Sequence, residues 1–295
     1  METARCKAFY AAATLGSLTA AADKLGYTPS GVSQLITALE DDLGFKLLER
    51  TRKGVRLTDE GAMMLPDVRM FLNSEYALYG LASDIKGLTV GSVNVASYPS
   101  VATYWLPEVI KKFGEDYPGI KINLLEGIRQ EMKDWLDEGT ADMGFLIYSE
   151  PMDRDWIPLA EDRMVAVLPK EHKYAGASHY PITECKEDDF IMPALGHDVD
   201  VENLLEEYNI VPKIKFTTME NPVMFAMIQS GLGMTITNEL CTTIWADRLA
   251  IKPLDPETNV TFGIALPKDR HQSPAVKKFI EYSVKMLTKS EKSKK

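Results

Sequence analysis

The feature that most constrains this fold is a pair of apolar stripes separated by a tight turn near the N-terminus. The first stripe, at positions i, i+3, i+4 and i+7, comprises Leu18, Ala21, Ala22 and Leu25. This spacing predicts a short amphipathic helix, which Ser17 or Thr19 can cap and Gly26 can end. Thr28 is a good N-cap for the next helix, and Pro29 suits its first position, which needs no backbone N–H. The second stripe comprises Val32, Ile36, Leu39 and Leu43.

The second helix carries an uncharged polar face opposite its stripe, made of Ser30, Ser33, Gln34 and Thr37. Short polar side chains suit a helix that enters the major groove of DNA. Gln34 can pair with adenine there, while Ser30 and Ser33 can contact a base or a phosphate. Two helices joined by a tight turn therefore predict a helix-turn-helix, with a merely solvated face as the alternative.

The next segment reads as a hairpin wing. Leu47–Arg50 and Val55–Thr58 predict two short strands, joined by a turn over Thr51–Gly54. The chain has a net charge of -10, but its first 60 residues are balanced, and Lys46–Arg56 carries five basic residues against one acidic residue. A local basic patch can neutralise phosphates while the acidic remainder faces away. A solvated basic loop is the alternative interpretation.

The first sixty residues resemble the LysR-type transcriptional regulators. The matching run is Ser17-Leu18-Thr19-Ala20-Ala21, Leu25, Thr28-Pro29-Ser30-Gly31-Val32-Ser33, Ile36, Leu39-Glu40, Leu43-Gly44, Leu47-Leu48-Glu49-Arg50 and Leu57-Thr58-Asp59-Glu60-Gly61. Two positions depart from the family: Leu48 stands where Phe is usual, and Gln34 where a basic residue is frequent. The resemblance implies a regulator that binds double-stranded promoter DNA, is controlled by a small-molecule effector and has RNA polymerase as a further partner. Its expected DNA-contacting residues are Thr28, Pro29, Ser30, Ser33, Gln34, Thr37, Arg50, Arg52 and Lys53.

Residues 59–87 predict one long helix that Thr58 caps. Its apolar stripe comprises Met64, Val68, Phe71, Leu78, Ala82 and Ile85. Such a stripe must be buried, and the resemblance implies pairing with the same helix of a second subunit, in a dimer or a tetramer. Packing within one chain is the alternative. Pro66 lies beyond the first turn, where proline kinks a helix or costs about 3 kcal/mol.

From Leu88 onward, strands alternate with helices, which predicts an α/β domain with a mostly parallel sheet. We expect strands at Val90–Ala96, Ile120–Leu125, Met143–Ile147, Met164–Leu168, Phe190–Met192, Lys213–Phe216, Met234–Ile236 and Val260–Leu266, and helices at Val101–Phe113 and ending at Trp135–Glu138. The resemblance implies two lobes similar to type 2 periplasmic binding proteins, with crossings near Asp162 and Leu266. The expected domains are residues 1–58, 59–87 and 88–295, with lobe I formed by 88–162 and 267–295 and lobe II by 163–266.

The expected effector site lies beyond the carboxyl ends of the strands. Ser100 precedes a helix and corresponds to the family's ligand-contacting Ser or Thr, although capping that helix is an equal alternative. Arg129 follows a turn and can supply a positive charge, with an ordinary surface arginine as the alternative. An organic or aromatic acid is the effector class we expect. The site residues predicted are Ser97, Tyr98, Ser100, Val101, Arg129, Met192, Pro193 and Ala194.

The sequence offers no pattern for catalysis or for a cofactor. Its four histidines lack metal-ligand spacing, and Cys-x-x-Cys, Walker A and Gly-x-Ser-x-Gly motifs are absent. The three cysteines, Cys6, Cys185 and Cys241, are widely separated, as in a reducing cytoplasm. Neither a signal peptide nor a long apolar run is apparent. The alternative is an enzyme or a transport-type binding protein whose first helices serve only for assembly.

Overall fold

The computed structural model describes residues 2–52, 54–85, 91–194, 198–268 and 272–291. The chain forms two compact units, one built mainly from its first 91 residues and the other from most of the remainder. The expected border near residue 87, the start of the strand predicted at Val90, and both His197 and His271 lie outside the described residues. No described helix has the length and apolar character that crossing a membrane requires.

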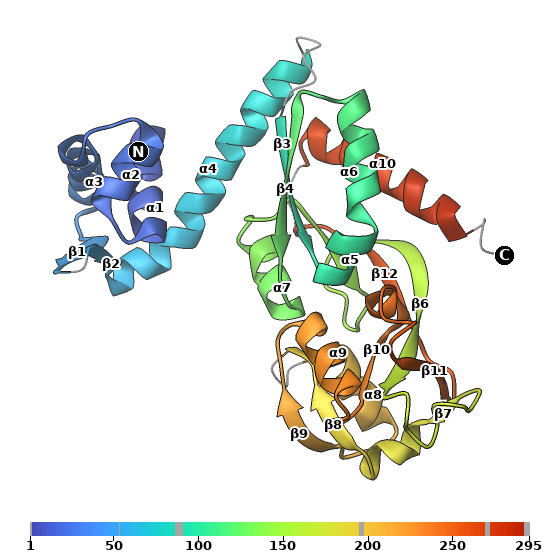
Figure 1. Cartoon of the computed structure of the whole chain (residues 1–295). Helices are drawn as coiled ribbons and strands as arrows, with labels where there is room; N and C mark the ends of the chain where they lie inside the picture. The colour runs from blue at the N-terminus through green and yellow to red at the C-terminus, as the bar shows by residue number, and fades with distance from the viewer. Residues whose placement is uncertain (1, 53, 86–90, 195–197, 269–271, 292–295) are drawn as a thin grey trace. The chain divides into compact units, whose positions relative to one another are not determined.

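Three helices form the head of the molecule: α1 (Thr3–Leu15), α2 (Leu18–Leu25) and α3 (Pro29–Leu43) (Figure 1). The predicted caps are confirmed, because the hydroxyl of Ser17 accepts from the N–H of Ala20 at 3.2 Å and that of Thr28 from Gly31 at 3.1 Å. Gly26 ends α2 with φ 71°, a conformation that favours glycine. The end of α3 is at Leu43, as its stripe predicted.

The core of the head joins all three helices. Phe9 of α1, Ala22 of α2, and Val32 and Leu39 of α3 are fully buried in one apolar cluster. The helix α1 was not delimited by the sequence argument, because its Ala-rich run shows almost no separation of apolar and polar faces. Burial of its small side chains lets the helices pack closely.

The wing follows α3 as an antiparallel hairpin of β1 (Leu48–Thr51) and β2 (Gly54–Leu57), one residue from the predicted bounds. Thr51 pairs with Gly54, so two residues form the loop. Gly54 has φ 137°, and a Cβ there would lie 2.1 Å from the carbonyl oxygen of Gly16. The neighbouring Val55 N–H donates to that same carbonyl at 2.9 Å. Glycine is therefore required where the wing meets the end of α1.

The long helix α4 (Asp59–Ile85) is capped by Thr58, whose hydroxyl accepts from the N–H of Gly61 at 2.9 Å, and it continues through Pro66. Its first half packs on the head: Val68 and Leu72 are buried in the head core, and Phe71 packs beside them. Farther along the helix, Leu78 and Tyr79 are each 68% exposed. The first part of the apolar stripe is therefore buried by packing within one chain, whereas Leu78 in its later part is not.

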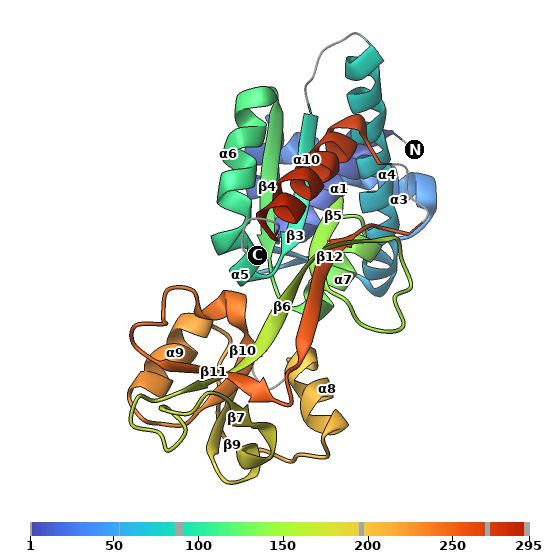
Figure 2. The same ribbon diagram turned by 90° about the vertical axis from the view of Figure 1, so that its right-hand side faces the viewer.

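The second unit is organised around a mixed sheet in the order β4-β3-β5-β12-β6-β11-β7, with β10 also pairing with β6 (Figures 1 and 2). Lobe I contains β3 (Gly91–Ser97), α5 (Pro99–Tyr104), α6 (Leu106–Asp116), β4 (Ile120–Glu126), α7 (Arg129–Asp137), β5 (Met143–Ile147), β12 (Asn259–Ala265) and α10 (Pro274–Glu291). The helix predicted from Val101 to Phe113 is in fact two helices, separated at Trp105. The aromatic rings of Phe113 and Phe279 pack edge to face and join α6 to α10.

Lobe II contains β7 (Tyr180–Pro181), η1 (Ile182–Lys186), β8 (Asp189–Met192), α8 (Val199–Glu207), β9 (Lys213–Thr217), α9 (Asn221–Gln229), β10 (Thr235–Asn238), η3 (Glu239–Thr242) and β11 (Ala250–Asp255). The prediction of a mostly parallel sheet is wrong, because β12 runs antiparallel to β5 and β6, and β10 and β11 run antiparallel to β6.

One strand, β6 (Trp156–Leu168), belongs to both lobes (Figure 2). Its first half pairs with β12 as far as Arg163, and its second half pairs with β10 and β11 from Met164 onward. This pairing agrees with the first expected crossing near Asp162. The second crossing lies in the first residues of β12, because Val260 still packs against the core of lobe II and Phe262 already pairs with Ile147 of β5, whereas the sequence argument placed it near Leu266.

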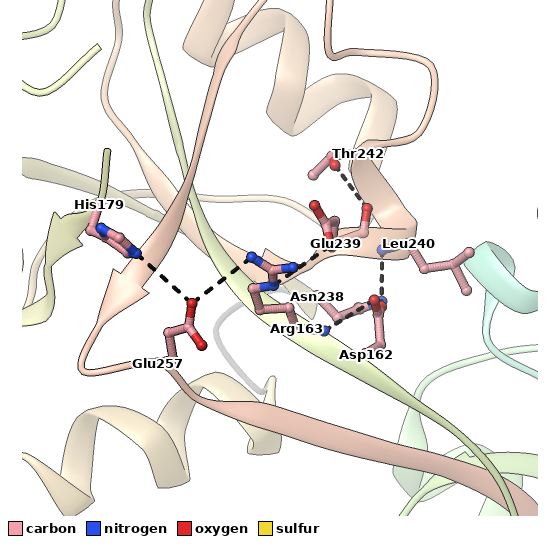
Figure 3. A network of polar contacts seen from close by, with 8 residues as sticks. All are labelled: Asp162, Arg163, His179, Asn238, Glu239, Leu240, Thr242 and Glu257. Carbon is pink, nitrogen blue, oxygen red and sulfur yellow. Dashed lines mark hydrogen bonds and ion pairs between the residues drawn. The ribbon is translucent and has the colours of Figure 1, made fainter. Parts of the chain in front are cut away.

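Polar contacts surround the crossing point of β6 (Figure 3). The carboxylate of Asp162 accepts from the side-chain amide of Asn238 at 2.8 Å and from the N–H of Leu240 at 2.9 Å. The guanidinium of Arg163 lies 3.9 Å from a carboxylate oxygen of Glu239 and 4.0 Å from one of Glu257. The first pair of bonds ties the start of η3 to β6, because an ionised carboxylate is a strong acceptor for N–H groups.

Candidate functional site

The polar face of α3 is available to a partner. The side chains of Thr28, Pro29, Ser30, Gln34 and Thr37 are exposed, and Ser33 is half-buried. Thr28 combines two contacts, because its hydroxyl caps α3 and lies 3.1 Å from the hydroxyl of Ser30. The predicted reading face therefore stands on the surface of a helix whose start is fixed by its own cap.

The structure links this face to the wing. A guanidinium nitrogen of Arg50 in β1 donates to the hydroxyl of Ser33 in α3 at 2.6 Å. Arg52 is exposed in the loop of the hairpin, whereas Lys53 lies outside the described residues. Arg56 pairs with Glu49 across the two strands at 2.6 Å, so part of the local positive charge is neutralised by the wing itself.

Sequence reasoning missed the contribution of Glu40. This side chain is only 6% exposed at the inner face of α3, and one oxygen accepts from the N–H groups of Leu47 and Leu48 at 2.9 and 3.2 Å. Its other oxygen accepts from the ammonium of Lys46 at 2.6 Å. Burial alone would raise the pKa of Glu40, but these hydrogen bonds outweigh it and lower the pKa. Glu40 thus fixes the entrance of the wing against α3.

A cavity of about 460 Å³ lies between the two lobes of the second unit. The starts of four helices meet there: Pro99 and Ser100 at α5, Arg129 at α7, Asp200 at α8 and Asn221 at α9. The η3 segment adds Cys241, whose thiol is buried with its pKa raised to about 11. This volume and this enclosure between lobes suit one small molecule.

Five of the eight predicted effector residues line this cavity: Tyr98, Ser100, Arg129, Pro193 and Ala194. The other three, Ser97, Val101 and Met192, are buried behind its wall and do not line it. Ser97 and Met192 end strands, in which neighbouring side chains point in opposite directions, whereas Val101 lies on the buried face of helix α5. Ala194 has φ 49°, a left-handed conformation that residues other than glycine seldom adopt and that is concentrated at binding sites.

Arg129 is the one basic residue among the described lining residues, and it bridges the lobes. One amino group of its guanidinium donates to the carbonyl of Ile147 and to the hydroxyl of Ser149, both at 2.9 Å. The other forms an ion pair with Asp200 of α8. The two side chains are only 12% and 16% exposed, so this pair is largely removed from water.

A second carboxylate adjoins the pair. Asp198 caps α8 by accepting from the N–H groups of Asp200 and Val201, both at 3.2 Å. Burial raises the pKa of Asp200 to about 6, an effect that Arg129 opposes and Asp198 reinforces. The sequence analysis missed both aspartates. Asp198 could have been found, because an aspartate just before the apolar residues of a helix is a recognisable N-cap signal.

Comparison with known proteins identifies the family of this chain. Residues 4–62 match the model of the bacterial regulatory helix-turn-helix proteins of the lysR family, and residues 86–288 match the LysR substrate binding domain. The chain belongs to the LysR family of transcriptional regulators. It is therefore a DNA-binding regulator with an effector-binding domain, from a family of regulators and not of enzymes.

Relatives of the same length support the LysR assignment. The uncharacterized regulator YvbU of Bacillus subtilis (strain 168) is 28% identical over 290 residues, which cover 97% of this chain and 99% of the relative. Full-length OxyR from Pseudomonas aeruginosa, solved as a cysteine variant, matches with TM-score 0.74 at 18% identity, covering 98% of each chain. CbnR complexed with its target DNA matches with TM-score 0.69 at 21% identity, covering 97% of this chain and 100% of that one. These similarities confirm the predicted fold.

Proposed function

We propose that this LysR-type regulator reads promoter DNA through the exposed face of α3 and the wing, and binds its effector in the cavity between the lobes. The hydrogen bond between Arg50 and Ser33 is the observation that carries the first part, because it fixes the wing and α3 as one surface. In this arrangement Gln34 contacts a base, and Arg52 contacts the phosphate backbone. The protein acts in the cytoplasm, with RNA polymerase as a further partner.

We further propose that the second half of α4, around Leu78 and Tyr79, pairs with the same helix of a second subunit. Leu78 and Tyr79 are each 68% exposed, which is unusual for large apolar side chains on a helix. A two-fold dimer presents two heads to two half-sites, and each head adds binding free energy. A dimer of dimers is compatible with the same contact. A single sedimenting monomer at micromolar concentration would contradict this proposal.

Quantitative gel shift of the full chain with the DNA upstream of its own gene tests the assigned surface. Gln34→Ala should change the preference among base-substituted sites. Arg52→Ala should weaken all sites similarly and reduce the slope of log K against log salt by about one unit. Lys111→Ala, which removes an exposed cation of α6, is the matched charge control. If both head variants bind as the parent does, the reading surface is wrongly assigned.

A further inference from the structure

The charges around the cavity indicate which class of ligand it takes, an inference that rests on its proposed role as the effector site. Among the described lining residues, five carboxylates stand against the single guanidinium of Arg129. The carboxylates belong to Glu126, Glu131, Asp198, Asp200 and Glu220. A cavity that selects an organic acid should show the reverse balance, because a negative ligand is repelled by an excess of negative groups.

The one cation is already neutralised by the chain. Arg129 forms its ion pair with Asp200 and fills its other amino group with Ile147 and Ser149. A simple anion that took the place of Asp200 would leave that carboxylate buried beside Asp198 without its cation. Breaking a largely buried ion pair in this way is strongly unfavourable, so the pair disfavours an anionic ligand.

The positive ends of two helices are occupied as well. Asp198 accepts from the free N–H groups at the start of α8, and Glu131 accepts from the N–H of Ile128 at 2.9 Å, at the start of α7. Helix starts are frequent anion sites because of their free N–H groups and dipole. Here the chain's own carboxylates use two of the four helix starts at the cavity, whereas the starts of α5 and α9 carry no side-chain cap and can meet an oxygen of the ligand.

We propose that the cavity binds a small molecule carrying a protonated amine together with an oxygen acceptor, as an amino-acid-like zwitterion does. The ammonium group lies against Asp198 and Asp200, two half-buried carboxylates of which only Asp200 is paired with the guanidinium. The oxygen meets Nε of Arg129, a buried N–H donor with no acceptor among the described residues. A ligand that satisfies both the buried N–H donor and the surplus carboxylate should bind with a more favourable free energy than an acid.

Three five-carbon probes of matched length test this proposal by isothermal titration calorimetry on the full chain: glutarate, 5-aminovalerate and cadaverine. They carry two carboxylates, one of each group, and two amines. We expect 5-aminovalerate to bind at least about tenfold more tightly than glutarate, with cadaverine also ahead of glutarate. Equal or tighter binding of glutarate, or no binding of either amine at millimolar concentration, would overturn the proposal.

Variants locate the effect in the cavity. Asp200→Asn should move the ratio of the two dissociation constants about tenfold toward glutarate, because it removes a carboxylate and releases Arg129. Glu206→Gln removes the same charge from an exposed position of α8 and should leave the ratio unchanged. The double variant Glu126→Gln and Glu220→Gln changes only exposed rim residues, and serves if Asp200→Asn does not fold. A ratio that neither cavity variant shifts contradicts the proposal.

The result separates this inference from the proposed function. Preferential binding of glutarate, strengthened by Asp200→Asn, would keep the cavity as a ligand site and reject only the charge argument. DNA binding by the head is measured independently by gel shift on the same preparation. Failure of that assay would reject the proposed function, whichever probe the cavity prefers.

Discussion

Replacing Glu40 with alanine should loosen the wing from the recognition helix. The variant removes the acceptor of two backbone N–H groups, of which that of Leu47 belongs to a fully buried residue. Hydrogen bonds to charged groups contribute about 1.5–3 kcal/mol each, and a buried donor left without an acceptor adds a penalty. Because the bond to Leu48 is longer, we expect Glu40→Ala to destabilise the wing by about 3 kcal/mol in total.

Two further variants separate the backbone bonds from the ion pair. Glu40→Gln keeps a neutral acceptor, so its cost should be about 1 kcal/mol. Lys46→Ala removes only the ion pair, and because Lys46 is 65% exposed its cost should stay below about 1 kcal/mol. The order of effects is therefore alanine at 40, then glutamine at 40, then alanine at 46.

Hydrogen exchange followed by mass spectrometry on the full chain measures the local effect in peptides that cover residues 45–58. A loss of about 3 kcal/mol corresponds to roughly 100-fold faster exchange at the amides of Leu47 and Leu48. Exchange within a factor of about three of the parent in Glu40→Ala, which is under about 1 kcal/mol, would refute the argument. An equal acceleration in Lys46→Ala would show instead that the ion pair holds the wing.

Three other predictions concern the same unit of the protein. The pKa of Glu40 is lowered from 4.5 in the folded chain, so the stabilisation that its carboxylate gives is complete above pH 4.5 and is lost as the pH falls through the lowered value. The difference in free energy of unfolding between the parent and Glu40→Gln should therefore become smaller in acid. Gly54→Ala places a Cβ 2.1 Å from the carbonyl oxygen of Gly16 at a positive φ and should lower the free energy of unfolding by at least about 2 kcal/mol in urea titrations, whereas an unchanged midpoint would argue against this close approach. Pro66→Ala restores an N–H that can donate to the carbonyl of Ala62, and should raise the local stability of α4 by up to about 3 kcal/mol. Hydrogen exchange in α4 should slow accordingly, and unaltered exchange would mean that Pro66 does not disturb the helix.

The elements that the sequence predicted well are those with local signals. Ser17 and Thr28 each bond a backbone N–H three residues later in the chain, and Gly26 needs only its own backbone conformation. Such signals depend on a few neighbouring residues, so they survive in any surroundings. The helix-turn-helix and its wing could therefore be placed within one or two residues.

The cavity depends on residues that no local pattern connects. Arg129 and Asp200 are 71 positions apart, and their pairing follows from the meeting of two lobes. We expected an acid effector because Arg129 is a lone cation in the sequence pattern, which does not reveal the carboxylates that the fold brings around it. In the same way, the first half of β6 was overlooked, because Pro158 and Glu161 interrupt the apolar run that identified its second half.

The linker helix shows how one pattern can hold two roles. The 3–4 spacing of apolar residues along α4 predicts that one face of the helix is buried, but this spacing is the same whichever surface covers that face. The structure shows that the head covers the part around Val68, while Leu78 stays exposed. Periodicity identifies a buried face without identifying what buries it.

The sharing of β6 between the lobes has a mechanical consequence. Since the hydrogen-bonded ladder cannot slide, the angle between the lobes changes only by flexing of this strand and of the β11–β12 connection. Asn238 both lines the cavity and donates to Asp162 at the point of flexure. A molecule that touches Asn238 therefore contacts the flexing part of β6 itself, and it shifts the interlobe angle to the extent that it binds the conformers of this strand with different affinities.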